Sequence, residues 1–306
     1  MLAALLLAQL GLSEYAILSL ARVMVLAVYA VGYNILFGYT GLLSLGHAMF
    51  FAAGLYGAGL SAAHLSLGAP AAFLLGIGAG FAMSLAIGLI VLRTSGVAFM
   101  IVTLMFAQAG YLTSLYFASY TRGDEGFALS GDIRRAVLPG GLSLDLASPV
   151  VRYNLALALL AVAVLGCLAL VRSRLGRVLV AIRENEVRTR MLGYDTHANK
   201  LLAFVVSGTV AAASGAAYAL LFAYVGATFA SIQYSILPLL WVLLGGAGTV
   251  LGPLVGTLLM FYLVDIASEQ TSAYMLVVGV ALLVLVVWFP KGLLGTLREK
   301  VVPWLP

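Results

Sequence analysis

The chain has 306 residues, of which 63% are hydrophobic and only 9% charged, and its mean hydropathy is +1.12. A soluble domain carries about 25% charged residues and has to cover its surface with polar groups. This composition excludes a soluble globular protein and predicts an integral membrane protein.

Long runs without charge predict membrane-spanning helices, because a bilayer core about 30 Å thick requires about 20 apolar residues per helix. Residues 1–12 are apolar but short, and no basic segment precedes them, which favours a short first helix over a cleavable signal peptide. Clear spans follow at 15–37, 42–62, 70–92, 97–118, 150–171, 200–225 and 272–289. We therefore expect residues 1–306 to form one all-α, polytopic transmembrane helical bundle of about eight to ten helices, with broken or re-entrant segments.

The apolar stretch 233–264 does not fit a simple span. Gly245, Gly246, Gly248 and Gly252 interrupt it near its middle. Each half has about a dozen residues, which at about 1.5 Å per residue is too short to cross a bilayer. The stretch is therefore either a re-entrant hairpin or two short spans, and we favour the hairpin.

Charges in the loops predict the orientation, since basic residues near short loops stay in the cytoplasm. The loop 172–199 is rich in arginine, whereas the connection 119–149 mixes acidic and basic residues. The first is therefore expected to be cytoplasmic and the second periplasmic or extracellular, with both termini in the cytoplasm. This count is consistent only if 233–264 returns to the side from which it started. The net charge of +5 is thus a signal of topology and does not indicate nucleic-acid binding.

Two glycine-rich segments, 38–47 and 245–253, place helix-breaking residues inside apolar stretches. Irregular backbone at membrane depth requires protein or a water-filled cavity to satisfy its polar groups, and broken helices often mark a translocation path. Plain helix–helix packing is the alternative interpretation. The candidate residues of the path are Asn34, Gly41, Ser44, Gly46, His47, Gly245, Gly246 and Gly248.

Catalytic and metal-binding patterns are missing from the sequence. His47 has no second His, Cys or carboxylate at ligand spacing, so a structural, hydrogen-bonded role is the ordinary interpretation and no metal is expected. The predicted spans contain no carboxylates, which ion-coupled carriers generally need at depth. No phosphate-binding loop ending in Gly-Lys-Ser/Thr occurs either. We expect a chain that is not an enzyme and binds no cofactor, and whose energy comes from elsewhere.

Three motifs occur in a recognisable order, covering the chain from about residue 30 to 260. They are the runs 38–51 (GYTGLLSLGHAMFF), 174–186 (RLGRVLVAIRENE) with Leu192-Gly193 after it, and 243–253 (LLGGAGTVLGP); a looser match is 121–126 (TRGDEG). Together they resemble the LivM-type permease subunits of branched-chain amino-acid ABC importers.

The resemblance implies one half of a heterodimer in a bacterial inner (cytoplasmic) membrane. The partners would be a LivH-like sister permease, two cytoplasmic ABC ATPases that hold ATP and Mg, a periplasmic or extracellular substrate-binding protein, and membrane lipid, but no nucleic acid. It also implies that part of 172–199 is a coupling helix that sits in a groove of an ATPase; a solvated topogenic loop is the alternative. The residues carried over to the coupling helix are Arg174, Gly176, Arg177, Arg183, Glu184, Asn185, Glu186 and Gly193.

The leading hypothesis is therefore a permease subunit that translocates branched-chain or related small amino acids, amides or carboxylates. The wider range of substrates reflects departures from the family pattern, such as Leu42 where glutamine is usual and the charged Arg122, Asp124 and Glu125 in the outer loop. An ion-coupled or facilitative carrier that acts without ATPase partners is the alternative. A membrane-embedded enzyme or sensor ranks third, because no reactive constellation is present.

Overall fold

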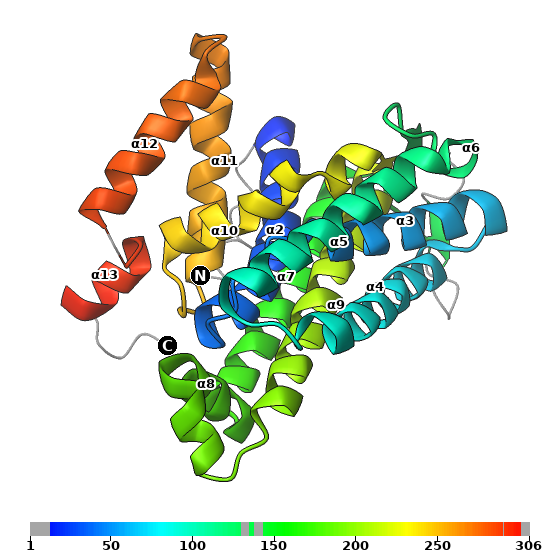
Figure 1. The fold of residues 1–306 in the computed structure, drawn as a ribbon. Coiled ribbons are helices and arrows are strands. Elements are labelled where there is room, and N and C mark those ends of the chain that lie inside the picture. Colours follow the sequence, from blue (N-terminus) through cyan, green and yellow to red (C-terminus); the bar gives the residue numbers. More distant parts are fainter. Residues whose placement is uncertain (1–12, 130–134, 138–142, 290, 301–306) are drawn as a thin grey trace.

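The computed structural model describes residues 13–129, 135–137, 143–289 and 291–300, and within them the chain is a bundle of long helices (Figure 1). Seven of these helices are long and apolar enough to cross a membrane, which confirms the predicted fold class. They are α2 (Glu14–Asn34) with its π-helical continuation η1 (Ile35–Tyr39), α3 (Ala48–Leu65), α4 (Ala69–Val91), α5 (Gly96–Tyr116), α7 (Pro149–Arg172), α9 (Thr196–Phe222) and α11 (Gly252–Gln270).

Shorter elements connect these spans. The helical ones are α6 (Ala118–Thr121), α8 (Arg174–Met191), η3 (Ala227–Ala230), α10 (Ile232–Gly245), α12 (Tyr274–Trp288) and α13 (Leu293–Lys300). Strand β1 (Phe127–Ala128) pairs antiparallel with β4 (Tyr224–Val225), and β2 (Arg135–Val137) with β3 (Ser143–Asp145).

Helix α2 lies at the centre of the bundle and packs against α7, α9 and α11. About 72% of its apolar stretch is buried within the chain, against 17% for α5, although both are apolar enough to span a membrane. The large side chains of Tyr29 and Tyr33 on α2 are fully buried. Only a helix surrounded by other helices can bury its whole circumference, so α2 is the core and α5 forms part of the periphery.

Small residues bring α3, α4 and α9 into close contact. A β-carbon at Gly54 would lie 2.0 Å from the carbonyl oxygen of Ala212, and one at Gly215 would lie 1.9 Å from that of Phe51. These separations leave no room for a side chain, so the backbones of α3 and α9 touch. Such close approach replaces the hydrophobic driving force that is missing between helices in lipid.

The predicted spans differ from the structure at two glycine-rich segments. The span expected at 42–62 begins only at Ala48, because the chain leaves the helix after Tyr39 and residues 40–47 are not helical. The second half of 233–264 is longer than expected, because α11 continues past Asp265 to Gln270 and has 19 residues. A carboxylate near the C-terminal end of the helix therefore does not mark its limit.

The arrangement of α10 and α11 bears on whether 233–264 forms the expected re-entrant hairpin. Gly245 faces Gly252 and Gly256 faces Trp241, so the two helices are antiparallel and the chain turns back on itself. Helix α11 is itself long enough to span a membrane, while α10 has 14 residues. Within the predicted span 272–289, α12 has 15 residues, fewer than the about 20 of a typical spanning helix. It nevertheless runs back along α11, because Gly292 after it packs against Gly246, which precedes α11.

Helix α8 of the 172–199 loop and α6 of the 119–149 connection lie at opposite ends of the bundle (Figure 1). Helix α9 begins beside α8 and ends at β4, which pairs with β1 of the 119–149 connection. At that second end the Tyr15 hydroxyl donates to the carboxylate of Asp265 over 3.0 Å. The predicted first helix at 1–12, and with it the position of the N-terminus, falls outside the described residues.

Candidate coupling and translocation site

The predicted path residues separate into two groups in the structure. Asn34, Gly41 and Gly248 lie with Gly38 and Arg183 where η1, the turn 246–251 and α8 meet, and we call this group the glycine joint. The second group is the histidine cluster, formed by Tyr33, Ser44, His47, Thr103 and Ser207. Gly46 adjoins the histidine cluster, and Gly245 and Gly246 lead into the turn of the glycine joint.

The glycine joint begins where α2 changes its winding. The last turn, Ile35–Tyr39, is π-helical, a rare form that is frequent at functional sites. The helix ends here. The Thr40 hydroxyl donates to the carbonyl of Ile35 over 3.0 Å, and Gly41 adopts φ +76°. Glycine reaches this left-handed conformation without the penalty of a β-carbon. The motif glycine therefore ends the first span and sends the chain away from the helix axis.

Asn34 joins this helix end to the turn 246–251. Its side-chain nitrogen donates to the carbonyl of Thr249 over 2.9 Å, and its side-chain oxygen accepts from the backbone N–H of Gly248 over 3.0 Å. The residue is fully buried, and these two bonds use a donor and the acceptor of its amide. A buried polar group without its partner costs about 1–3 kcal/mol. Asn34 therefore holds two broken segments together although they are far apart in the sequence.

Close backbone contact makes glycine necessary at Gly38. A β-carbon there would lie 2.0 Å from the side-chain oxygen of Asn34 and 2.5 Å from the backbone nitrogen of Gly248. In the turn itself, Gly248 adopts φ +75°, and the Thr249 hydroxyl accepts from the N–H of Gly252 over 3.1 Å at the start of α11. The turn is therefore shaped by glycine and satisfied by polar groups of the same segment.

Arg183 enters the glycine joint from α8. Its guanidinium donates to the carbonyl oxygen of Gly38. A β-carbon at Gly41 would lie 2.7 Å from Cγ of Arg183, and one at Gly248 would lie 3.1 Å from Nη1. The side chain therefore occupies space that the two glycines leave open. Arg183 is among the residues expected to contact an ATPase. In the structure its guanidinium instead contacts the chain's own broken helix.

Helix α8 consists of two helices, because Asn185 has non-helical backbone angles of φ −161° and ψ 100°. Its side-chain oxygen accepts from the N–H of Arg188 over 2.9 Å, which caps the second helix. In that second helix Glu186 pairs with Lys200 of α9 at 2.7 Å, and the Lys200 side chain is only 9% exposed. The kink therefore separates a part that contacts the glycine joint from a part that is tied to α9.

The environment of Glu186 stabilises its charged form. Partial burial alone would raise the pKa of this carboxyl, but the hydrogen bond and charge of Lys200, with smaller contributions from Thr196 and Arg190, outweigh it. The pKa of Glu186 is therefore lowered from its ordinary value. A charged Glu186 at neutral pH keeps the buried ammonium of Lys200 paired.

The other predicted coupling residues lie along α8 or directly after it. Gly176 is buried where α7 meets α8, and a β-carbon there would lie 2.4 Å from the carbonyl oxygen of Leu170. Gly193 follows the helix with φ +88° and has nothing near its β-position, so it sets a turn rather than a close contact. Exposed charges complete the set: Arg174, Arg177 and Glu184.

In the histidine cluster, His47 is fully buried and acts as a structural donor. Its Nε2 lies 2.8 Å from the hydroxyl oxygen of Ser207, and that hydroxyl donates to the carbonyl of Gly32 over 2.6 Å. Because Ser207 has a single proton, it accepts from His47, which places the imidazole proton on Nε2. The rings of Tyr33 and Phe50 stand edge-on to the imidazole at 4.8 and 5.4 Å. The contacts hold the ring in place and support the structural interpretation.

Residues 44–47 are irregular, and groups from neighbouring helices bond to part of their backbone. The Tyr33 hydroxyl donates to the carbonyl of Ser44 over 2.9 Å, and the N–H of Leu45 donates to the Thr103 hydroxyl of α5 over 3.1 Å. A β-carbon at Gly46 would lie 2.2 Å from the carbonyl oxygen of Thr103. This segment therefore packs tightly against α5, as irregular backbone at membrane depth requires.

Neither group lines either of two cavities found among the described residues. A cavity of about 610 Å³ lies between α3, α4 and α5, and another of about 400 Å³ between α4, α7 and α9. None of the predicted path residues contributes to either wall. In the same described ranges, no group of three or more His, Cys, Asp and Glu side chains is placed to hold a metal ion.

Sequence reasoning missed Thr103, Ser207 and Lys200 as parts of these groups. Thr103 and Ser207 lie in apolar stretches of their helices, and that isolation was the available signal, whereas Lys200 lies in the more polar first turns of α9. Polar groups buried in protein are hydrogen-bonded, so single Ser, Thr or Lys residues in a span point to a partner from another helix. Which helix supplies the partner depends on the fold and could not be read from one sequence.

Comparison with known proteins agrees with this architecture. Residues 15–287 match the family described as "Branched-chain amino acid transport system / permease component". The "High-affinity branched-chain amino acid transport system permease protein LivM" of Escherichia coli (strain K12) is 29% identical, with 90% of this chain and 69% of that protein covered. The protein of the same name from Salmonella typhimurium is 28% identical over the same shares. No solved structure matches. The chain is an integral membrane protein that belongs to the family of branched-chain amino acid transport system permease components.

Proposed function

We propose that this chain is one permease subunit of an ATP-driven importer whose substrates are branched-chain or related small amino acids, amides or carboxylates. The observation that carries the proposal is the contact of α8 with both broken segments at the glycine joint. A helix outside the membrane that touches the ends of two membrane segments is suited to pass on a movement imposed by a partner. The printed names of the two relatives, which refer to high-affinity branched-chain amino acid transport, favour that substrate class.

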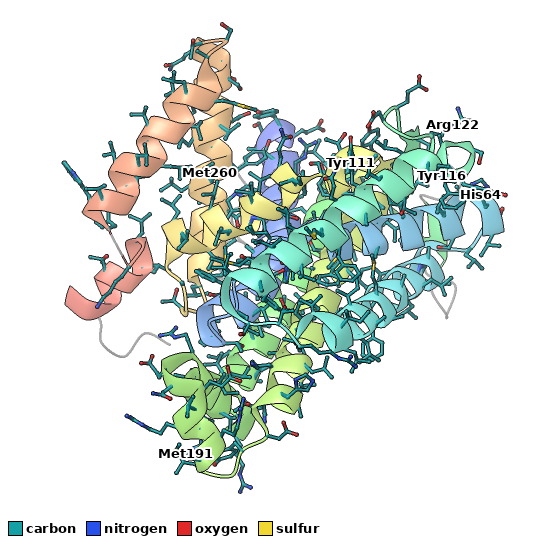
Figure 2. All side chains as sticks on the ribbon, in the orientation of Figure 1. His64, Tyr111, Tyr116, Arg122, Met191 and Met260 are labelled. Carbon is teal, nitrogen blue, oxygen red and sulfur yellow. The ribbon has the colours of Figure 1, made fainter. Side chains whose placement is uncertain are left out.

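The surface of α8 supports docking of a partner at its far end. Met191 is 81% exposed and Leu192 72% exposed, and Val187 is also exposed. Figure 2 shows Met191 at the tip of the molecule, far from the labelled Arg122, Tyr116 and His64. Exposed apolar residues with charges around them are typical of protein interfaces. We assign this tip to a groove of an ABC ATPase, two copies of which would hold ATP and Mg.

The remaining partners follow from the same proposal. A LivH-like sister permease would form the heterodimer, and a substrate-binding protein would deliver the solute on the periplasmic or extracellular side. The chain would lie in a bacterial inner membrane with α8 and both termini in the cytoplasm. Single cysteines at Met191 and Arg122, introduced after replacement of Cys167, test this orientation. Labelling of Met191→Cys by an impermeant reagent in intact cells, with Arg122→Cys protected, would contradict it.

The second candidate is a carrier that is ion-coupled or facilitative and works alone. Uptake measurements in proteoliposomes separate the two functions. The proposal predicts uptake of radiolabelled leucine only with the sister permease, the ATPases, the binding protein and internal ATP. Each component is omitted in turn as a control. Uptake by the chain alone, driven by an ion gradient and independent of ATP, would overturn the proposal and favour the carrier.

A further inference from the structure

We infer that Arg183 is a positioning residue inside this chain, through which α8 moves the end of α2 and the turn 246–251 together. The inference rests on the proposed function and adds a step to it: docking and transmission use different residues of α8. The exposed tip around Met191 meets the partner, and Arg183 passes the movement on to the membrane segments.

Arg183 is engaged inside the chain although its side chain remains 39% exposed. Its guanidinium donates to the carbonyl of Gly38, between the positions that a β-carbon would take at Gly41 and Gly248. The carbonyl belongs to the last turn of the helix, where the final C=O groups have no partner within the helix. Glu184 lies 3.3 Å from Nη2 of Arg183 on the exposed side and balances its charge. A guanidinium held in this way is already engaged before any partner arrives.

Asn34 makes the two receiving segments one unit. It bonds to the backbone of the turn at Gly248 and at Thr249, while its own helix carries Gly38 one turn further on. A pull on the Gly38 carbonyl therefore reaches the start of α11 through the same joint. The turn also contacts the C-terminal region, since a β-carbon at Gly292 would lie 2.5 Å from the backbone of Gly246. The turn that Arg183 contacts at Gly248 is therefore also packed against the segment after α12.

The kink at Asn185 divides the movement. Before it, the first helix of α8 carries Arg183; after it, the second helix carries the exposed tip and the Glu186–Lys200 ion pair to α9. A displacement of the tip consequently reaches α9 through Lys200 and the glycine joint through Arg183. The non-helical residue lets the two helices reorient without bending a continuous hydrogen-bonded helix.

The test compares Arg183→Gln with Met191→Asp, and uses Arg177→Gln as the matched control on the exposed surface of the same helix. Hydrogen exchange is measured on peptides covering 35–41 and 246–251 in the purified permease pair. We expect exchange in Arg183→Gln to rise by about tenfold, the loss expected for one charge-assisted hydrogen bond. Met191→Asp and Arg177→Gln should exchange as wild type. Arg183→Lys, which keeps a donor and a positive charge, should recover part of the protection.

The assembled importer supplies the second measurement. In Arg183→Gln the ATPase subunits should still co-purify, but stimulation of ATP hydrolysis by substrate-loaded binding protein should fall by about tenfold. In Met191→Asp the ATPase subunits should be lost. Unchanged exchange in Arg183→Gln, or loss of the ATPase subunits from this variant, would overturn the inference and return Arg183 to the docking surface. A wild-type assembly without stimulated hydrolysis would refute the proposed function, while the exchange data would still decide the role of Arg183.

Discussion

The glycine joint and the histidine cluster look alike in the sequence and differ in what they contact. Both contain helix-breaking glycines in an apolar stretch, and both sequences predict a translocation path. In the structure, the histidine cluster is closed by side chains of α5 and α9 within the bundle, through Thr103 and Ser207. The glycine joint instead receives Arg183 from α8, the charged helix between α7 and α9. One motif is therefore closed by spans of the bundle, and the other contacts a helix whose far end is exposed; under the proposed function a partner would act on that end.

The largest effect on transport is expected at Gly46, which packs against α5 beside the histidine cluster. Gly46→Leu would place a side chain where even a β-carbon lies 2.2 Å from a backbone carbonyl of α5. Overpacking of this kind costs about 1–3 kcal/mol or more, because backbone has to shift. We expect insertion into the membrane but no transport, measured as uptake by the assembled importer. Gly166→Leu, where nothing lies within 4 Å of the β-position, is the control. Normal uptake by Gly46→Leu would show that 44–47 tolerates rearrangement.

Asn34→Ala tests whether the two broken segments depend on each other. The substitution removes two hydrogen bonds and leaves the buried N–H of Gly248 and the carbonyl of Thr249 without this partner. We expect a loss of about 2–6 kcal/mol in the free energy of unfolding, from about 1–3 kcal/mol for each group. Thermal unfolding in detergent measures it, and Asn199→Ala at the start of α9 is the comparison. Equal stability of the two variants would mean that the joint is not held by Asn34.

His47→Ala should have a smaller effect than Gly46→Leu on transport. The substitution removes one hydrogen bond to Ser207, which keeps its bond to the Gly32 carbonyl. The loss of a buried aromatic contact and of one neutral hydrogen bond lowers stability, but leaves no charge unpaired. We expect reduced thermal stability with transport that is lowered and not abolished. Complete loss of uptake in a variant that folds and assembles would give His47 a role in the path.

The smallest effect concerns the ion pair of Glu186 on α8 with Lys200 on α9. Because the pKa of Glu186 is lowered in the folded chain, its pairing with Lys200 stabilises the protein above the unfolded pKa of about 4.3. This stabilisation is lost as the pH falls through the lowered folded pKa. Glu186 is 32% exposed, so the expected contribution is about 1 kcal/mol or less. The difference in melting temperature between wild type and Glu186→Gln should shrink as the pH falls below the unfolded pKa of about 4.3; a difference that is independent of pH would contradict the assignment.

The sequence predicted the fold class and most spans because apolar runs and loop charges report directly on the bilayer. It failed at 40–47 and at the end of α11 for a local reason: hydropathy does not register a π-helical turn, nor a carboxylate that lies near the end of a span. The sequence also does not predict which of the path residues lie together. Asn34 and Gly248 are brought together by packing of α2 and α11, and nothing in the spacing of the two motifs specifies that contact.

The most direct test of the central claim is Arg183→Glu in the assembled importer. The carboxylate would face the carbonyl oxygen of Gly38, so an attraction within the glycine joint becomes a repulsion. ATP-driven uptake and stimulation of ATP hydrolysis by substrate-loaded binding protein are measured together on the same preparation. The account predicts that the permease pair still forms and that both uptake and stimulation are lost. Unchanged uptake with unchanged stimulation would show that α8 does not act on the membrane segments through the glycine joint.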